Sequence, residues 1–241
     1  MGSANTPSGG GCTYETSPHR TTIWSVAAQA KRAFNKTLVR VDGLLALHPV
    51  IHGTSGRPRR HVSDILRGAL VLAVAALDSL VVDSVVEAVP SLARKGALGK
   101  TAGKWIREDP EAVLACLAEK DPHAALSALY KAQLGQVTFQ RASAIEGVLR
   151  DVINCEPPWE QAASILSRQS GDSWATEDVT QELDHYVSRR NKIVHGGDLK
   201  TGGSSAAAEP IQLPYVERAA VVVQGIGDGT SKVVYRRVRN A

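Results

Sequence analysis

The chain has 241 residues, of which 43% are hydrophobic and 22% charged, so a disordered or fibrous protein is excluded and one main core is expected. A formal net charge of +4 and a pI of about 9.0 suit a polyanionic partner. Aromatic residues make up only 5%, which favours closely packed helices over a strand-rich sandwich. The three cysteines are widely separated, odd in number and without zinc-ligand spacing, which favours a reduced, cytoplasmic setting.

The first part of the chain combines a tail, a helix and a basic loop. Residues 1–20 are small and polar and have no apolar run like that of a secretory signal, so we expect a flexible tail. Apolar residues spaced by three and four from Thr21 to His48 predict an amphipathic helix. From Pro49 onward, prolines and glycines predict a loop. This loop carries three arginines: Arg57, Arg59 and Arg60.

The most hydrophobic stretch predicts a long helix over 64–89, with Ser63 as its N-cap and its end before Pro90. It is about as long as a membrane span. Three acids lie inside the stretch, however, and charges near the centre of a bilayer helix are costly. These acids are Asp78, Asp83 and Glu87. We therefore expect the central helix of a soluble bundle and no membrane insertion.

Further helices are predicted down the chain, the first two of them opened by Asp-Pro steps. Their ranges are 110–119, 121–134, 138–154, 157–169 and 176–195. Residues 198–209 have the composition of a flexible connector. The C-terminal segment fits either a hairpin around Asp228-Gly229 or a helix weakened by glycines, and we favour the helix. The predicted fold class is all-α, an antiparallel helical bundle.

The helix expected at 176–195 ends in "SRRNKIVHGGD", which contains Arg190, Asn191 and His195. Arginine supplies a planar cation suited to phosphate, and histidine can transfer a proton near neutral pH. Together they can cleave RNA without a metal, by attack of a 2′-OH on its own phosphate. Arg190 and His195 lie about 140° apart around a helix, so a loosened last turn or a second helix is needed to bring them to one atom. Asn191 and His195 share a face, which lets Asn191 orient the imidazole.

A purely structural interpretation accounts for the same residues. Lys192 and His195 followed by two glycines form an ordinary helix C-terminus, because cations there complement the helix dipole and glycine stops the helix. An arginine followed by a histidine at this spacing is also frequent by chance in a chain of this composition. No G-x-S-x-G signature for a serine hydrolase is present.

The stretch "RNKIVHGG" at 190–197, preceded by the apolar helix at 62–87, resembles the HEPN superfamily and most closely its RiboL-PSP-HEPN branch. That family's signature is an arginine, an adjacent polar residue, and a histidine four to six residues after the arginine. The resemblance covers about 62–200. It implies a HEPN-like helical bundle at 61–200, an additional N-terminal helix with the basic loop at 21–60, and a linker with a C-terminal helix at 201–241.

The resemblance also implies residue roles. His195 would transfer the proton, Arg190 would bind phosphate and Asn191 would orient the group or bind substrate. Arg189 stands at a permitted spacing as an alternative arginine, and Asp78 is a supporting acid that could pair with the arginine or the histidine. Further RNA contacts would come from Lys192, Tyr186, Arg57, Arg59 and Arg60; for Tyr186 and Lys192, a half-buried core tyrosine and a solvated lysine remain the alternatives.

The activity implied is that of an endoribonuclease that needs neither metal nor cofactor. It would act as a homodimer with two facing motifs, in a toxin–antitoxin or phage-defence system with an antitoxin or defence protein as partner. The alternative is a catalytically inactive HEPN-like module that binds RNA or protein. A domain in which the motif is only a helix cap remains a third interpretation.

Overall fold

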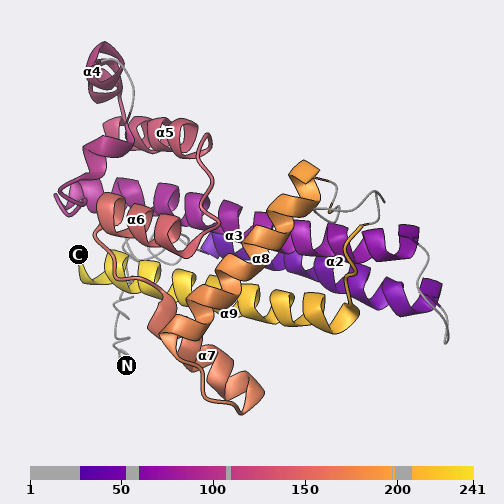
Figure 1. Ribbon diagram of the computed structural model, residues 1–241. Helices are drawn as coiled ribbons and strands as arrows, with labels where there is room; N and C mark the ends of the chain where they lie inside the picture. The colour runs from indigo at the N-terminus through magenta and orange to yellow at the C-terminus, as the bar shows by residue number, and fades with distance from the viewer. Residues whose placement is uncertain (1–27, 53–59, 107–109, 197, 199–207) are drawn as a thin grey trace, which may run out of the picture.

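The computed structural model describes residues 28–52, 60–106, 110–196, 198 and 208–241. Within these ranges the chain forms α-helices, one short 3-10 helix at Ala102–Trp105 and no β-strand, which confirms the all-α fold class (Figure 1). The α-helices are α2 (Ala28–His52), α3 (Arg60–Arg94), α4 (Pro110–Ala118), α5 (Pro122–Leu134), α6 (Ala142–Ile153), α7 (Trp159–Ser170), α8 (Thr176–Gly196) and α9 (Leu213–Asn240).

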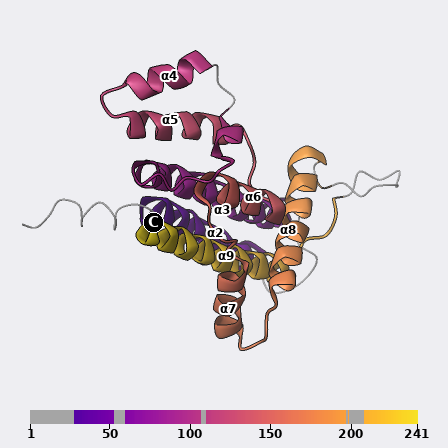
Figure 2. The ribbon, with the colours of Figure 1, turned by 90° about the vertical axis from the view of Figure 1, so that its left-hand side faces the viewer.

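The long helix α3 is the centre of the bundle. It contacts α2, α5, α6, α8 and α9. The helices α2, α3 and α9 lie side by side, α8 crosses them obliquely, and α4 lies on the outer side of α5 (Figures 1 and 2). This arrangement leaves one face and the C-terminal end of α8 at the surface.

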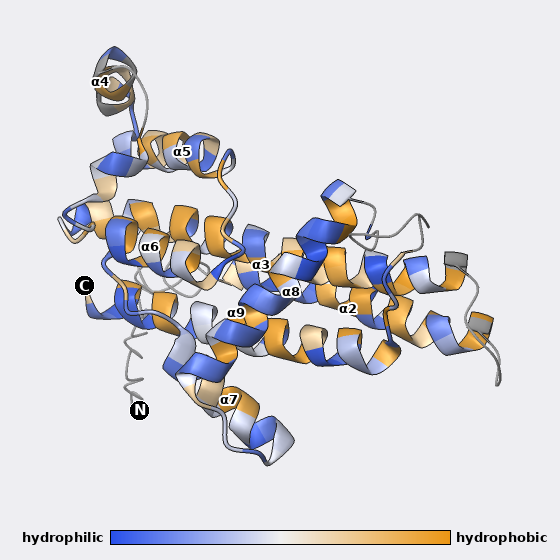
Figure 3. Cartoon of the chain, in the orientation of Figure 1, coloured by the Kyte–Doolittle hydropathy of each residue, from blue (hydrophilic) through white to orange (hydrophobic). Residues whose placement is uncertain are grey.

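Helix α3 is apolar along most of its length (Figure 3). Its segment Val62–Arg94 has a mean hydropathy of 2.2 and is long and apolar enough to cross a membrane, yet 61% of the most apolar window is buried by the rest of the chain. Such burial is what the core helix of a soluble bundle requires, as the sequence predicts.

The ends of α3 differ from the prediction. The helix begins at Arg60, three residues before the expected cap Ser63, and continues through Pro90 to Arg94. Proline removes one backbone donor, but Val89 and Leu92 are fully buried and hold the helix together by packing. The helix ends at Arg94, and the turn that follows has Gly96 at a φ of 61°; the amides of Gly96 and Ala97 donate to the carbonyls of Ala93 and Leu92 at 3.0 and 2.8 Å.

Helix α2 likewise passes the position where a loop was predicted. Pro49 lies within its last turn and the helix ends at His52. Arg57 and Arg59 of the predicted basic loop lie outside the described residues. Arg60 is the first residue of α3, and its side chain also lies outside the described part.

The C-terminal segment is the helix α9, so the alternative hairpin around Asp228-Gly229 is wrong. The glycines that weaken this helix lie where other helices approach it closely. A β-carbon at Gly227 would lie 2.4 Å from the Phe34 ring, and one at Gly229 would lie 2.9 Å from the carbonyl oxygen of Pro158. Glycine is therefore needed for packing at these positions.

The helices α2 and α9, expected as additions to a bundle at 61–200, belong to its core. One apolar cluster contains buried residues of α2, α3, α5, α6, α7, α8 and α9. Phe34 of α2 and Ile226 of α9 are 2% and 0% exposed. Removing either helix would expose the apolar face of α3.

The shorter helices begin and end within a few residues of their predicted bounds. Asp121 caps α5 by accepting hydrogen bonds from the amides of His123 and Ala124 at 3.2 and 3.1 Å. Helix α6 begins at Ala142 rather than at 138. The preceding residues Phe139 and Gln140 instead donate hydrogen bonds to Asp78 of α3.

Candidate functional site

The candidate site lies at the C-terminal end of α8. The helix buries Val179, Leu183, Tyr186 and Val187 against the bundle and remains helical through Gly196. The loosened last turn that could have brought Arg190 and His195 together within one chain is therefore absent from this helix. The two side chains leave α8 about 140° apart.

Arg190 and Asn191 form a pair at this end. Arg190 Nη1 donates to Asn191 Oδ1 at 3.1 Å, and both side chains are half-buried. Arg190 Nε is buried without a hydrogen-bond partner, and no carboxylate of the described residues pairs with this guanidinium. Within the part of the chain that the structure describes, the positive charge of Arg190 is therefore uncompensated.

His195 is exposed in the last turn of α8. Asn191, four residues earlier, was expected to orient its imidazole, but the Asn191 side-chain oxygen accepts from Arg190. An exposed imidazole at this position can reach an external ligand and exchange protons with it.

Arg189 has a different environment. Its guanidinium donates to Asp198 Oδ2 at 2.8 Å, to the carboxylate of Glu209, and to the carbonyl oxygens of Glu209 and Pro210, each at 3.1 Å. Two carboxylates thus compensate its charge. Of the two arginines that the spacing permitted, Arg190 is the one available to a phosphate.

Asp198 is the centre of a buried ionic cluster beside the site. It is 1% exposed, has a φ of 59°, and its Oδ2 also accepts from Arg67 Nε of α3 at 2.9 Å. Its amide donates to the carbonyl of Lys192, and its carbonyl accepts from the amide of Glu209. These bonds attach the end of α8 to α3 and to the segment that leads into α9.

The sequence pattern did not predict this cluster, because 198–209 has the composition of a flexible connector. Asp198, Glu209 and Pro210 at its two ends are fixed in place, while 199–207 lies outside the described residues. Arg67 is 131 residues away from Asp198 in sequence. No local pattern predicts a pairing across such a separation.

Asp78 does not support the α8 residues. Its two carboxylate oxygens accept from the amide of Phe139 at 2.6 Å and from Gln140 Nε2 at 3.0 Å. Instead of pairing with an arginine or histidine of the site, Asp78 fixes the segment before α6. The correction follows from its place on α3, where residues 139 and 140 pass.

The expected RNA-contacting side chains divide into three groups. Tyr186 is 1% exposed, its ring centroid lies 5.3 Å from that of Tyr215, and burial raises the pKa of its phenol. Because it is buried, Tyr186 is not on a surface that RNA could contact. Lys192 is exposed, and it lies three residues before His195 on the same side of α8. The side chains of Arg57, Arg59 and Arg60 lie outside the described part of the structure, so their role stays a prediction.

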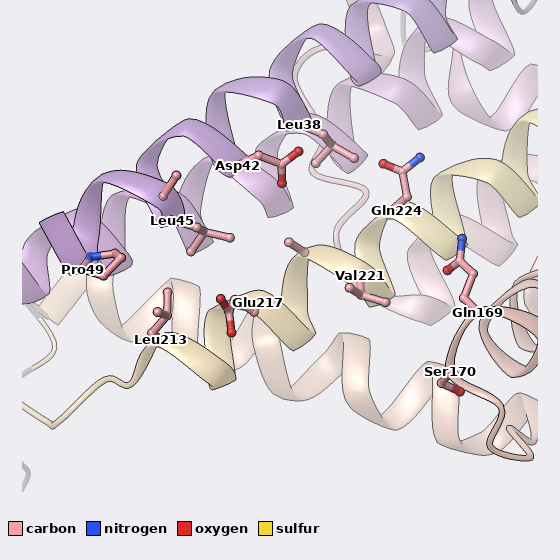
Figure 4. A pocket seen from close by; sticks show the side chains of 12 residues that line it. Leu38, Asp42, Leu45, Pro49, Gln169, Ser170, Leu213, Glu217, Val221 and Gln224 are labelled. Atoms are coloured by element: carbon pink, nitrogen blue, oxygen red, sulfur yellow. The ribbon is translucent and has the colours of Figure 1, made fainter.

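A groove of about 840 Å³ lies between α2, α9 and the end of α7 (Figure 4). Its walls are largely apolar, and the carboxylates of Asp42 and Glu217 enter from α2 and α9. None of the side chains that line it is basic. The groove is therefore unsuited to a nucleic-acid phosphate.

A second groove, of about 600 Å³ and also largely apolar, lies beside the α8 site. It is formed by α3, by Leu44 of α2 and by Ile193 of α8. Ile193 lies between Arg190 and His195 in sequence, and the next residue, Val194, is 47% exposed. The α8 motif is thus accompanied by uncovered apolar surface.

Within the described residues, no group of three or more His, Cys, Asp or Glu side chains is arranged to hold a metal ion. No protein-family model, curated protein or solved structure matches this chain. Its function is therefore inferred from the residues and their geometry.

Proposed function

We propose that this chain is a metal-independent endoribonuclease of the HEPN type, acting in the cytoplasm as a homodimer within a toxin–antitoxin or phage-defence system. The observation that carries the proposal is the pairing of Arg190 with Asn191, without a carboxylate partner, near the exposed His195. An uncompensated guanidinium and an exposed imidazole on one helix end are the groups that RNA cleavage needs.

The proposed reaction is an internal transesterification. His195 accepts the proton of a ribose 2′-OH, and the resulting oxygen attacks the adjacent phosphorus. The bond from phosphorus to the 5′-oxygen breaks, and that oxygen receives a proton from solvent water as it leaves. Arg190 stabilises the charge that develops on the phosphoryl oxygens. The products are a 2′,3′-cyclic phosphate and a 5′-hydroxyl.

A second copy of the chain completes the site in this proposal. Because α8 is regular, one copy directs Arg190 and His195 to different sides of the helix. A two-fold axis beside α8 would place Arg190 of one copy opposite His195 of the other. The exposed Val194 and the apolar groove at Ile193 support an interface there, since uncovered apolar surface is a common mark of protein contacts.

The test is cleavage of a single-stranded RNA in EDTA by the purified chain. We expect fragments that end in 2′,3′-cyclic phosphate and a loss of about a hundredfold or more in rate for His195→Ala. The matched control is His123→Ala, on α5 and away from the site, which should cleave at the wild-type rate. Equal cleavage by His195→Ala and wild type would contradict the mechanism.

A second candidate function is RNA binding without cleavage. It is favoured by the imidazole of His195, which has no hydrogen bond to a described residue that would set its tautomer and orientation. This candidate predicts RNA binding that weakens with rising salt, together with an absence of cyclic-phosphate products. The EDTA assay distinguishes the two.

A further inference from the structure

A pocket of about 400 Å³ lies on the outer face of α8. Four residues of α8 line one side: His185, Ser188, Arg189 and Lys192. The other side is formed by residues 209–212, which run beside α8 (Figure 2), and by Tyr215 of α9. The α8 residues recur at three- and four-residue spacings, and His195 continues this face beyond Lys192.

Tyr215 gives the pocket an unused hydrogen-bonding group. Its hydroxyl oxygen is buried and has no hydrogen-bond partner in the described structure. Burial raises the pKa of this phenol to about 12, so it is neutral and able to donate at physiological pH. A buried polar group without a partner carries an energetic cost, which a bound ligand could remove.

The walls of the pocket suit a flat ring. The Tyr215 ring meets the ring of His185 edge to face, with centroids 5.7 Å apart, and Ile211 adds an apolar side chain that is 7% exposed. Aromatic and apolar walls together with a few hydrogen-bonding groups are the features by which proteins hold single unstacked bases.

The exposed side of the pocket carries one uncompensated cation. Lys192 is exposed and pairs with no carboxylate of the described residues, whereas the charge of Arg189 is compensated by Asp198 and Glu209. An ammonium group there suits the phosphate of a nucleotide whose base enters the pocket.

The adjoining pocket around Trp174 shares His185 and Tyr215 but has the opposite charge. It is lined by Asp172, Asp178 and Glu182, and its arginine, Arg218, already pairs with Glu182 and lies over the Trp174 ring at 5.0 Å. These carboxylates would repel a phosphate. A nucleotide is therefore favoured in the pocket beside Lys192.

We infer that the pocket formed by α8, residues 209–212 and Tyr215 binds one nucleotide, with its base at Tyr215 and His185 and its phosphate at Lys192. This nucleotide would be the one that flanks the cleavage position in the RNA. The inference rests on the proposed function for its RNA substrate. Binding of a single nucleotide, however, requires no cleavage.

The experiment is a calorimetric titration of the full chain with each of the four nucleoside 3′-monophosphates, and separately with inorganic phosphate. We expect at least one nucleotide to bind. Lys192→Ala should weaken that binding about tenfold or more, and Tyr215→Phe, which removes one oxygen atom, about fivefold. The control Lys131→Ala, exposed on α5, should bind like wild type.

Three results would overturn the inference: no nucleotide binding, binding that neither Lys192→Ala nor Tyr215→Phe changes, or phosphate binding as strong as nucleotide binding. The last would mean a simple anion site without base recognition. Nucleotide binding that depends on both residues, in a protein that does not cleave RNA, would support this pocket and reject the nuclease. RNA cleavage without any nucleotide binding would support the nuclease and reject this pocket.

Discussion

Replacement of Asp198 by asparagine removes one negative charge from the buried cluster beside the α8 site while keeping the shape of the side chain. Asp198 is 1% exposed, and its Oδ2 accepts from both Arg67 and Arg189. The side chains of these arginines are only 9% and 14% exposed, so water cannot replace the lost carboxylate. The substitution therefore leaves two largely buried cations with less compensation.

Removing one member of a buried ion pair costs about 3–5 kcal/mol. The lower end applies here, because both guanidinium groups also donate to the carbonyl oxygen of Glu209, and Arg189 keeps the carboxylate of that residue. We therefore expect Asp198→Asn to lower the free energy of unfolding by about 3 kcal/mol. In a chain of this size that corresponds to a fall in Tm of about 6–12 °C.

The measurement is urea and thermal unfolding followed by circular dichroism. The control is Glu146→Gln, which removes the charge from a pair whose arginine, Arg150, is 61% exposed, and it should cost about 0.5 kcal/mol or less. A change of less than about 0.5 kcal/mol for Asp198→Asn would refute the idea that this cluster holds the end of α8 in place.

Three further predictions concern packing, the choice of arginine and alkaline pH. Gly229→Ala would bring a β-carbon within 2.9 Å of a backbone oxygen and should cost about 1–3 kcal/mol in chemical unfolding. By contrast, Gly43 is exposed on α2 and its added β-carbon would meet nothing within 4 Å, so Gly43→Ala should stabilise by about 0.5–1 kcal/mol. Arg190→Ala should lower RNA cleavage about a hundredfold with an unchanged Tm. Arg189→Ala should mainly lower the Tm, because Arg189 pairs with Asp198 and Glu209, and the opposite pattern would assign the site to Arg189. Burial raises the pKa of Tyr130 from 10.0 to about 12, so the unfolded chain loses that proton first, and the associated stability, complete below about pH 10, is lost as the pH rises towards 12. Tyr130→Phe should therefore reduce the decline of the free energy of unfolding in urea between pH 10 and 12 by up to about 1.4 kcal/mol per pH unit, and an unchanged slope would contradict the burial of this phenol.

The fold was predictable where a local pattern decides it. The apolar periodicity of α8 and the Asp121 cap of α5 depend on residues within a few positions of one another. Helix ends at prolines were not predictable, because packing around Pro90 outweighs the local penalty. The glycines of α9 left a hairpin open beside the favoured helix, because their contacts with other helices cannot be predicted from the local sequence.

The candidate site, like the fold, was predictable only where residues close in sequence decide it. Arg190, Asn191 and His195 are close in sequence, so a local motif is enough to indicate them. The compensation of Arg189 by Asp198 could not be predicted, because it depends on how the chain returns to α8 after residue 198. The hydrogen bond from the amide of Phe139 to Asp78 could not be predicted either, because it depends on how α3 and α6 are placed relative to each other.

The composite site is tested most directly by mixing two inactive variants. Arg190→Ala and His195→Ala chains, unfolded and refolded together in equal amounts, would form mixed dimers in which one site has an intact arginine from one copy and an intact histidine from the other. We predict recovery of about a quarter of the wild-type cleavage rate. About half of the dimers are mixed, and in each mixed dimer one of the two composite sites is intact. Mixed dimers that form but stay inactive would contradict a site shared between two copies.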